Sequence, residues 1–310
     1  MIKTIFQQYQ GYFFALLASV FNGMIGILSV EIMSTGLSPY AVAFYKCFVA
    51  FIVITSYLMI SGQIHAWIGY MKQMWRQILV AGFFGLFILF FFETTAYNHE
   101  KVSIVAFMLL GASVITTFVL SAILKRKWLG LNETISCSLA IGGLAMLFGF
   151  KLEFSENSIG IFLAIIAGVG YGTFLTISPR FKIGSGLAVV NSFMLFGMLF
   201  LFAPFAYEGL VFVTDMKAVL LLLFLSLLPT IIGFMCTTKA LTLIKSESVQ
   251  LIELSEPVFA LILSSLLLNE SISFWQMGGG FLLISSIYVN LALNQRVATD
   301  STQAETALAA

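Results

Sequence analysis

The chain has 310 residues, of which 60% are hydrophobic and only 9% are charged, and its mean hydropathy is +1.03. A soluble globular chain carries about 25% charged residues, so this composition excludes a water-soluble protein and indicates one that is embedded in lipid. The net charge of +1 lacks the basic excess that nucleic-acid binding requires, so we expect no nucleic-acid partner.

Ten apolar runs are long enough to cross a bilayer, since a spanning helix needs about 20 residues. They cover residues 11–33, 39–60, 77–98, 102–124, 131–150, 158–178, 186–206, 218–239, 247–268 and 274–293. The first run is too long for a signal peptide and lacks a cleavage site of small residues, so we expect it to remain in the protein as the first span. We predict an all-α integral membrane protein with ten transmembrane helices, a cytoplasmic N-terminus (1–10) and a disordered cytoplasmic tail (294–310).

Basic residues between the runs predict the orientation, because cytoplasmic loops carry an excess of Lys and Arg. With the N-terminus inside, the cytoplasmic ends hold Lys3, Lys72, Arg76, Lys125, Arg126, Lys127, Arg180, Lys182, Lys239, Lys245 and Arg296. The opposite side holds only Lys101, Lys151 and Lys217. We therefore predict that both termini lie in the cytoplasm.

The two halves of the chain resemble each other. At a shift of 149 residues, "GYFFALLASVFNG" (11–23) matches "GIFLAIIAGVGYG" (160–172), and at a shift of 144 "FMLLGASVI" (107–115) falls on "LIELSEPVF" (251–259). We predict two five-helix repeats, 11–150 and 158–293. Because five is odd, the second repeat enters the membrane from the opposite side, and such inverted repeats provide the outward- and inward-open states of transporters.

The first two runs carry one polar face and two charged residues. Asn22 shares its face with small residues, namely Ser19, Gly26 and Ser29. Such a face permits close helix approach or lines a site, and we select Asn22 as a candidate for binding substrate or proton. Glu31 lies about 180° from Asn22 around the helix, and Lys46 lies inside the second run at a similar depth. We therefore favour a structural Glu31–Lys46 ion pair over a role for either residue in substrate binding.

Glu93 lies within the third run, in "FFFETTAYN", with Tyr97 one turn later and Phe90 one turn earlier. A carboxylate beside aromatic faces suits an organic cation, and an ionisable group inside a span also suits proton coupling. The alternative is a polar packing residue with satisfied hydrogen bonds. We select Glu93 and Tyr97 as candidates for binding substrate or proton.

The second half supplies a matching tyrosine and a proline. Tyr171 and Gly172 occupy the repeat positions of Asn22 and Gly23, so we expect Tyr171 to face the same central cavity from the other half. Pro229 lies inside the run 218–239 and is expected to kink that helix. The kink serves either gating or ordinary packing.

The ninth run combines two glutamates with a proline. One polar stripe follows from the helical spacing and consists of Ser246, Gln250, Glu253, Pro257 and Ser264. Glu253 is near the centre of this stripe and Glu256 about 60° further round. Pro257 lacks an N–H and deprives the carbonyl of Glu253 of its helical partner. We select Glu253 and Gln250 for substrate or proton, and Glu256 and Pro257 mainly for architecture, with Glu256 bonding a neighbouring helix.

Other reactive side chains are scattered. The cysteines Cys47, Cys137 and Cys236 lie in separate runs with no CxxC pair, which is typical of packing residues. His65 and His99 fall in different polar segments. The sequence therefore predicts no metal site, no catalytic group and no cofactor beyond a proton.

These features together resemble the drug/metabolite transporter superfamily, specifically its EamA-type branch, over residues 11–293. The resemblance rests on the five-plus-five spans, on Asn22–Gly23, and on "SPYAVAFYKCFVA" (38–50), in which Tyr45–Lys46 is similar to the family's aromatic-basic pair. It rests above all on "ELSEPVFALILSSLLLNE" (253–270), which is similar to the family's Glu-Pro-Val-Phe-Ala helix closed by an acidic residue. The first half departs from this pattern, with Ser113 in place of the proline and Lys127 about where the acid is expected.

The resemblance implies a bacterial inner-membrane secondary transporter of small organic solutes, often an exporter, driven by proton coupling, by exchange or by the solute gradient. No GxxxxGK[ST] motif for ATP occurs in the sequence. We expect a monomer or homodimer in the cell inner (plasma) membrane that exports an amino acid, another metabolite or a drug-type solute.

Three alternatives remain at this stage. The first is an importer or exchanger of an organic cation such as a choline-like compound. The second is a non-transporting membrane scaffold, which would not need an inverted duplication. The third is an intramembrane enzyme, which would need a nucleophile–base pair or metal ligands at matching depth; the runs contain no cluster of His, Asp or Cys.

Overall fold

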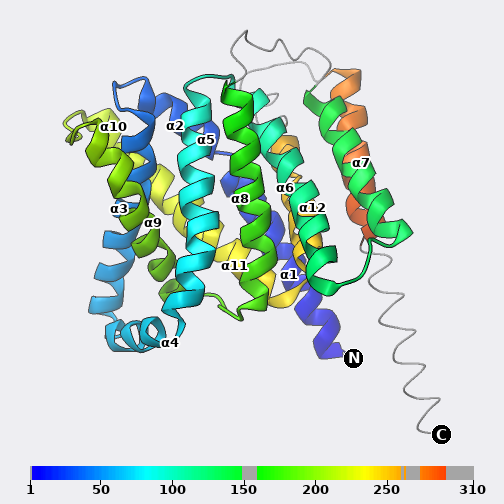
Figure 1. Cartoon of the computed structure of the whole chain (residues 1–310), viewed down its shortest axis with the longest axis horizontal. Coiled ribbons are helices and arrows are strands. Elements are labelled where there is room, and N and C mark those ends of the chain that lie inside the picture. Colours follow the sequence, from blue (N-terminus) through cyan, green and yellow to red (C-terminus); the bar gives the residue numbers. More distant parts are fainter. Residues whose placement is uncertain (1, 149–158, 260–261, 263–272, 291–310) are drawn as a thin grey trace, which may run out of the picture.

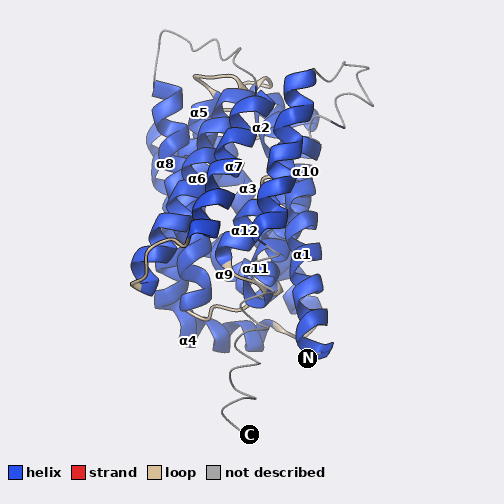
Figure 2. Cartoon of the chain, turned by 90° about the vertical axis from the view of Figure 1, so that its right-hand side faces the viewer, coloured by secondary structure: helices blue, strands red, loops and turns tan. Residues whose placement is uncertain are grey.

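A computed structural model describes residues 2–148, 159–259, 262 and 273–290 of the chain. Every regular element in these ranges is a helix, and the long helices run side by side as one bundle (Figures 1 and 2). Within the same ranges, eight continuous helical stretches are long and apolar enough to cross a membrane. The protein is thus an all-helical membrane protein.

The first half consists of the following helices, in chain order: α1 (Ile2–Asn22), α2 (Ile25–Met33), α3 (Pro39–Ile60), α4 (Ile64–Gly82), the π-helix η1 (Phe83–Ile88), α5 (Leu89–Tyr97), α6 (Val102–Lys125) and α7 (Leu131–Phe148). The second half contains α8 (Ile159–Arg180), α9 (Leu187–Glu208), α10 (Met216–Leu225), the π-helix η2 (Ser226–Gly233), α11 (Phe234–Leu243) and α12 (Ser246–Glu253), followed by helical residues at 256–259 and 274–290.

The first eight predicted runs correspond to the eight candidate spans. The predicted ninth and tenth spans correspond to α12 with 256–259 and to 274–290, and neither is a candidate span by length within the described ranges. The tail at 294–310 and the residues Ser264 and Glu270 lie outside the described residues. Helix α1 begins at Ile2, so most of the segment predicted to precede the first span is helical.

The third span begins at Ile64, thirteen residues before the predicted start. The additional turns are amphipathic: His65, Lys72 and Arg76 are exposed, while two aromatic side chains face the bundle. Trp67 Nε1 donates to Ser192 Oγ at 2.9 Å and Tyr70 OH donates to the Ile183 carbonyl at 2.7 Å. These bonds to the second half hold a segment that hydropathy alone placed outside the span.

The two π-helices lie at corresponding points of the third and eighth spans. Segment η1 packs on α8, and η2 packs on α1, the helix that corresponds to α8 in the first repeat. Pro229 lies within η2, so the predicted kink takes the form of a widened turn, in which Thr230 Oγ1 donates to the Leu225 carbonyl at 2.8 Å. Such π-segments are frequent at functional sites.

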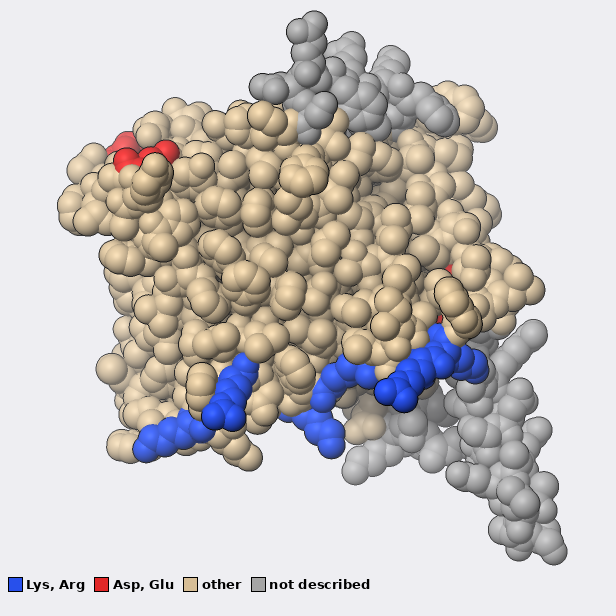
Figure 3. Space-filling view, in the orientation of Figure 1, with Lys and Arg blue, Asp and Glu red and all other residues tan. Residues whose placement is uncertain are grey.

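Basic residues gather at one end of the bundle. Figure 3 shows Lys and Arg along the edge where α1 begins, and hardly any on the rest of that face. This is the separation of charge that the loop composition predicts, because residues of α4, the α6–α7 turn and the α8–α9 turn meet at that end.

Candidate solute-binding cavity

A cavity of about 50 Å³ lies between the two halves. Its wall consists of Asn22, Ile25, Lys46, Leu89, Phe90, Glu93, Tyr97, Ala106, Leu109, Leu110, Tyr171, Pro229, Thr230, Phe234 and Glu256. A water molecule occupies about 30 Å³ in the liquid, so this conformation has room only for water-sized molecules. The cavity is therefore small in this conformation.

Four of the selected residues lie on the cavity wall, namely Asn22, Glu93, Tyr97 and Tyr171. Asn22 and Tyr171 face the cavity from α1 and α8, as the repeat register predicts. Gln250 and Glu253 are buried but do not contact the cavity. Whether these residues bind solute remains a prediction.

Lys46 and Glu93 form a buried ion pair on the cavity wall. The distance between Lys46 Nζ and Glu93 Oε2 is 3.7 Å, and the two side chains are 1% and 8% exposed. Neither of these two atoms makes a hydrogen bond. The ammonium instead lies 3.6 Å from the centre of the Phe90 ring, while Tyr97 OH donates to Glu93 Oε1 at 3.2 Å.

This geometry leaves binding capacity unused. An ammonium has three N–H donors, and burial of a charge is costly unless it is paired and hydrogen-bonded. Lys46 lines the cavity and its buried Nζ has no hydrogen-bond partner, so a solute that reaches Nζ would find unused N–H donors. Glu93 Oε2 can likewise accept from a donor.

The predicted Glu31–Lys46 pair is wrong. Glu31 Oε1 pairs with Lys217 Nζ at 2.5 Å, and these side chains are 48% and 58% exposed. Helix α10 packs against α2, which brings Lys217 to the outer face of α2. Lys46 faces inward instead, toward α5. The sequence singled out Lys46 as a charge inside a span, and that signal alone would have placed it at the cavity.

Glu253 is held by neutral donors. Tyr171 OH donates to Glu253 Oε2 at 2.5 Å and Thr237 Oγ1 donates to Oε1 at 2.7 Å, and the residue is 1% exposed. Among the residues that the structure describes, no cation pairs with it. Its carboxyl therefore lies one layer behind Tyr171, which separates it from the cavity.

The other polar residues of α12 also bond to neighbouring helices. Gln250 Oε1 accepts from Thr117 Oγ1 at 3.4 Å, whereas Gln250 Nε2 has no partner. Ser246 Oγ donates to the Leu175 carbonyl at 2.8 Å. The predicted stripe thus faces α6 and α8 rather than open space.

A break between α12 and 256–259 determines where the two glutamates point. The chain turns at 254–255, where Ser255 N–H donates to the Ile252 carbonyl at 2.9 Å. Pro257 lies in the first turn of the new helix, where its missing N–H is tolerated. The break places Glu256 on the cavity wall beside Gly23, at which a Cβ would lie only 3.3 Å from Glu256 Cγ.

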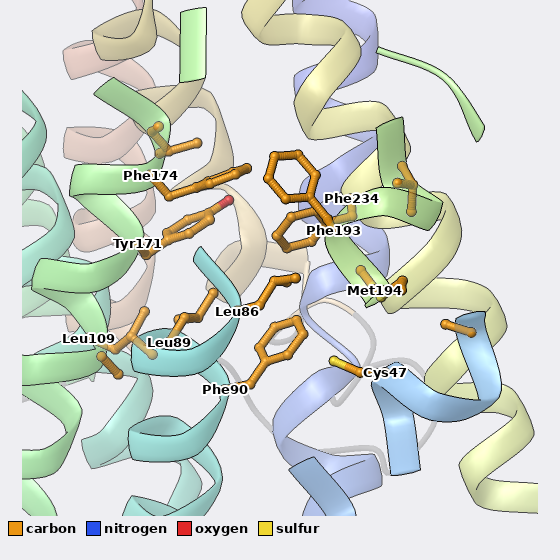
Figure 4. Packing of buried hydrophobic residues seen from close by; sticks show 14 of the residues in the cluster. Cys47, Leu86, Leu89, Phe90, Leu109, Tyr171, Phe174, Phe193, Met194 and Phe234 are labelled. Atoms are coloured by element: carbon orange, nitrogen blue, oxygen red, sulfur yellow. The ribbon is translucent and has the colours of Figure 1, made fainter. Parts of the chain in front are cut away.

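Three phenylalanines lie on the basic side of the cavity. Phe174, Phe193 and Phe234 come together where α8, α9 and α11 meet (Figure 4), with ring centres 5.2–6.2 Å apart. Phe234 lines the central cavity, and Phe193 lines a second cavity of about 420 Å³ that also contacts Ser178 and Thr238. The aromatic cluster therefore separates the central cavity from a space near the basic end.

Within the described ranges, no three His, Cys, Asp or Glu side chains come together as a metal-binding group. Cys47 and Cys236 are buried free thiols in the apolar packing. The polar groups on the cavity wall are one ammonium, two carboxyls, two phenols, one amide and one hydroxyl.

A bundle of membrane-crossing helices with a buried, charged cavity between two related halves is the architecture of many secondary transporters. The sequence matches the profile of the EamA-like transporter family at residues 9–149 and again at 158–292. The chain belongs to this family of transporters.

One solved structure, described only as "Crystal structure of protein", is similar to this chain with a TM-score of 0.76 at 15% sequence identity. The similarity covers 93% of this chain and 98% of that one. At this identity it shows a shared fold and nothing about the solute. No curated protein matches the sequence.

Proposed function

We propose that the protein is a secondary transporter that moves a small organic solute across the cell inner (plasma) membrane by alternating access. The observation that carries the proposal is the Lys46–Glu93 pair, whose facing atoms are buried without hydrogen bonds on the wall of a cavity between the two halves. Charges inside a membrane are costly, so a pair with unused donors and acceptors suits binding better than packing.

The charges of the cavity favour an amino-acid-type solute. Lys46 would bind its carboxylate, while Glu93 and Glu256 would bind its ammonium group from opposite halves. The apolar part of the solute would contact Tyr97 and Tyr171. A solute with both charges leaves fewer buried charges unpaired than either a pure anion or a pure cation.

Alternating access would use the paired π-helices. Segments η1 and η2 each contact the first helix of the opposite repeat, so a change in either widened turn moves one half against the other. The aromatic cluster of Phe174, Phe193 and Phe234 would close the basic side in this conformation. By the positive-inside rule this side is the cytoplasmic one, with the N-terminus inside.

Glu253 is our candidate proton carrier. It is buried, it is held by two hydroxyls and it has no cation partner among the described residues. Tyr171 links it to the cavity wall, so solute binding and proton binding would share one side chain. Export driven by this proton exchange is the direction that the family resemblance favours.

A second candidate function is transport of an organic cation such as a choline-like compound. The carboxyls at and behind the wall (Glu93, Glu253 and Glu256) outnumber the single lysine, and aromatic faces attract quaternary ammonium groups. Lys46 already occupies the Phe90 face, which argues for the amino-acid-type solute.

The test is solute counterflow in liposomes that contain the purified protein. Vesicles preloaded with one unlabelled amino acid, choline or nucleoside are diluted into the same labelled solute. We expect accumulation of label with a zwitterionic amino acid, none in empty liposomes, and loss of it in the Lys46→Met/Glu93→Gln variant. Absence of counterflow with every solute, with or without a pH gradient, would contradict the proposal.

A further inference from the structure

A further pocket lies at the basic end, apart from both cavities described above. Its volume is about 300 Å³, and it lies between the α6–α7 turn and the start of α12. Its lining includes three lysines, Lys125, Lys127 and Lys245, together with Trp128, Glu247 and Asn290. Nothing in the proposed transport cycle uses this pocket.

The turn "KRKWLG" (125–130) gives the pocket its charge. Arg126 adopts a left-handed conformation (φ 51°) that ends α6, and Lys127 N–H closes the helix end by donating to the Ala122 carbonyl at 3.1 Å. Three consecutive basic residues thus lie at a helix C-terminus, where cations are favoured. Lys125 also forms an ion pair with Glu247 of α12, so the pocket wall connects the two helices.

The two acidic residues of the pocket are already engaged. Glu247 pairs with Lys125, and Glu133 Oε2 accepts from Gly130 N–H at 2.9 Å. Lys127 is exposed, and no ion pair holds its side chain among the described residues. The pocket therefore offers positive charge to an anionic ligand.

An apolar groove of about 470 Å³ adjoins the pocket, and both share Ala122, Lys127, Trp128 and Leu129. The groove continues along Val119 and Ile123 of α6, which are 45% and 64% exposed. In a chain that spans the membrane, such exposed apolar residues face acyl chains. Trp128 is 92% exposed at the junction of groove and pocket, and tryptophan is enriched at the level of the headgroups.

We infer that this pocket and groove together bind one anionic phospholipid, with the phosphate and headgroup beside Lys125 and Lys127 and an acyl chain along Val119 and Ile123. Basic pockets between transmembrane helices on the cytoplasmic side are typical of sites for anionic headgroups. A free phosphate ester would use the basic pocket alone and leave the groove empty, so the adjoining groove favours a lipid.

The site lies at one end of the short helix that carries Glu253. Helix α12 begins at Ser246 beside the pocket and ends at Glu253. A lipid held between the α6–α7 turn and Glu247 would therefore contact the element that positions the candidate proton carrier.

Native mass spectrometry of the full chain tests the site independently of transport. Protein stripped of lipid is titrated with equal amounts of phosphatidylglycerol and phosphatidylcholine. We expect one phosphatidylglycerol to be retained in preference to phosphatidylcholine, and the preference to fall by about tenfold in Lys125→Gln/Lys127→Gln. Lys127→Gln alone, which breaks no ion pair, is expected to show a smaller loss in a protein of unchanged stability.

The matched control is Lys72→Gln/Arg76→Gln, which removes two exposed basic residues of α4 at the same end of the bundle and is expected to retain the lipid. Excess glycerol phosphate separates the two sources of phosphate, and we expect it not to displace the lipid. Equal retention of both lipids, an equal loss in the control, or displacement by glycerol phosphate would overturn the inference.

Discussion

Glu93 and Thr237 occupy equivalent positions in the two halves, and their surroundings differ in one decisive way. At a shift of 144 residues "FFFETTAY" (90–97) falls on "FMCTTKAL" (234–241), directly after each π-helical segment. Glu93 forms an ion pair with Lys46, while Thr237 donates to a carboxyl from another helix, Glu253. The position equivalent to Glu253 is Leu109, an apolar residue of the cavity wall.

Each half therefore supplies a buried carboxyl from a different helix and with a different partner. The first half balances its carboxylate with an ammonium, and the second half satisfies its carboxyl with two hydroxyls. A charge-balanced pair suits the binding of a charged solute, whereas a carboxyl held by neutral donors suits the gain and loss of a proton. The symmetric fold thus encloses a cavity with distinct chemistry on its two sides.

The largest effect is expected from Lys46→Met, which leaves Glu93 buried without its cation. Removal of one partner from a buried ion pair costs about 3–5 kcal/mol, so the melting temperature in detergent should fall sharply. The double variant Lys46→Met/Glu93→Gln removes both charges and should recover most of this stability without recovering counterflow. Recovery of counterflow together with stability would show that the pair is purely structural.

Glu253→Gln tests the other half. The amide oxygen still accepts a hydrogen bond from one of the two hydroxyls, so stability should change by only about 1 kcal/mol. Solute–solute exchange should persist, whereas accumulation driven by a pH gradient should be lost. The control Glu31→Gln changes an exposed carboxylate and should leave both activities intact. Normal pH-driven accumulation in Glu253→Gln would exclude it as the proton carrier.

Gly85→Ala examines the contact between η1 and α8. A Cβ at this glycine would lie 2.4 Å from Cδ2 of Phe174, so the ring of the aromatic cluster must shift. Overpacking of this kind costs about 1–3 kcal/mol, and the thermal midpoint and the counterflow rate should both decrease. Gly111→Ala is the matched control, since its Cβ would meet no atom within 4 Å. Equal thermal midpoints and counterflow rates in the two variants would show that the contact between η1 and α8 has no role in transport.

Two hydroxyl deletions compare the two halves directly. Tyr171→Phe removes one of the two donors to Glu253, with an expected cost of about 1–3 kcal/mol for a buried acceptor left short of a partner. Tyr97→Phe removes the 3.2 Å bond to Glu93, whose other oxygen still faces Lys46, and should cost less. Thermal unfolding of both variants measures the two losses of stability. A larger loss for Tyr97→Phe than for Tyr171→Phe would contradict the conclusion that Glu253 depends more on its hydroxyl donor than Glu93 does.

Most of the fold could be predicted, because hydropathy indicates the membrane spans and the matching positions of small residues indicate the repeats. The predicted start of the third span was wrong, because hydrogen bonds of Trp67 and Tyr70 hold an amphipathic segment against the second half. In the site, the repeat register correctly predicted that Asn22 and Tyr171 lie on one cavity. The position of Glu256 could not be predicted, since a break at 254–255 changes the helical phase between it and α12. The position of Glu253 depended on which helices pack against the polar stripe, which periodicity does not show.

The ion-pair partner of Lys46 could not be predicted from the sequence either. Similar depth in the membrane suggested Glu31, but depth does not specify which side of a helix faces which neighbour. The packing of α2 against α10 directs Glu31 outward, and the packing of α3 against α5 brings Lys46 to Glu93. Pairings between helices that are far apart in the chain depend on tertiary packing, which periodicity does not encode.

The most direct test of the central claim compares counterflow of an amino acid with that of its decarboxylated amine, which has the same side chain and lacks only the group assigned to Lys46. We predict that the wild-type protein exchanges the amino acid at least about tenfold faster than the amine, and that Lys46→Met/Glu93→Gln exchanges neither solute faster than empty liposomes do. Equal exchange of the two solutes by the wild-type protein, or exchange of the amino acid by the double variant at the wild-type rate, would contradict the account.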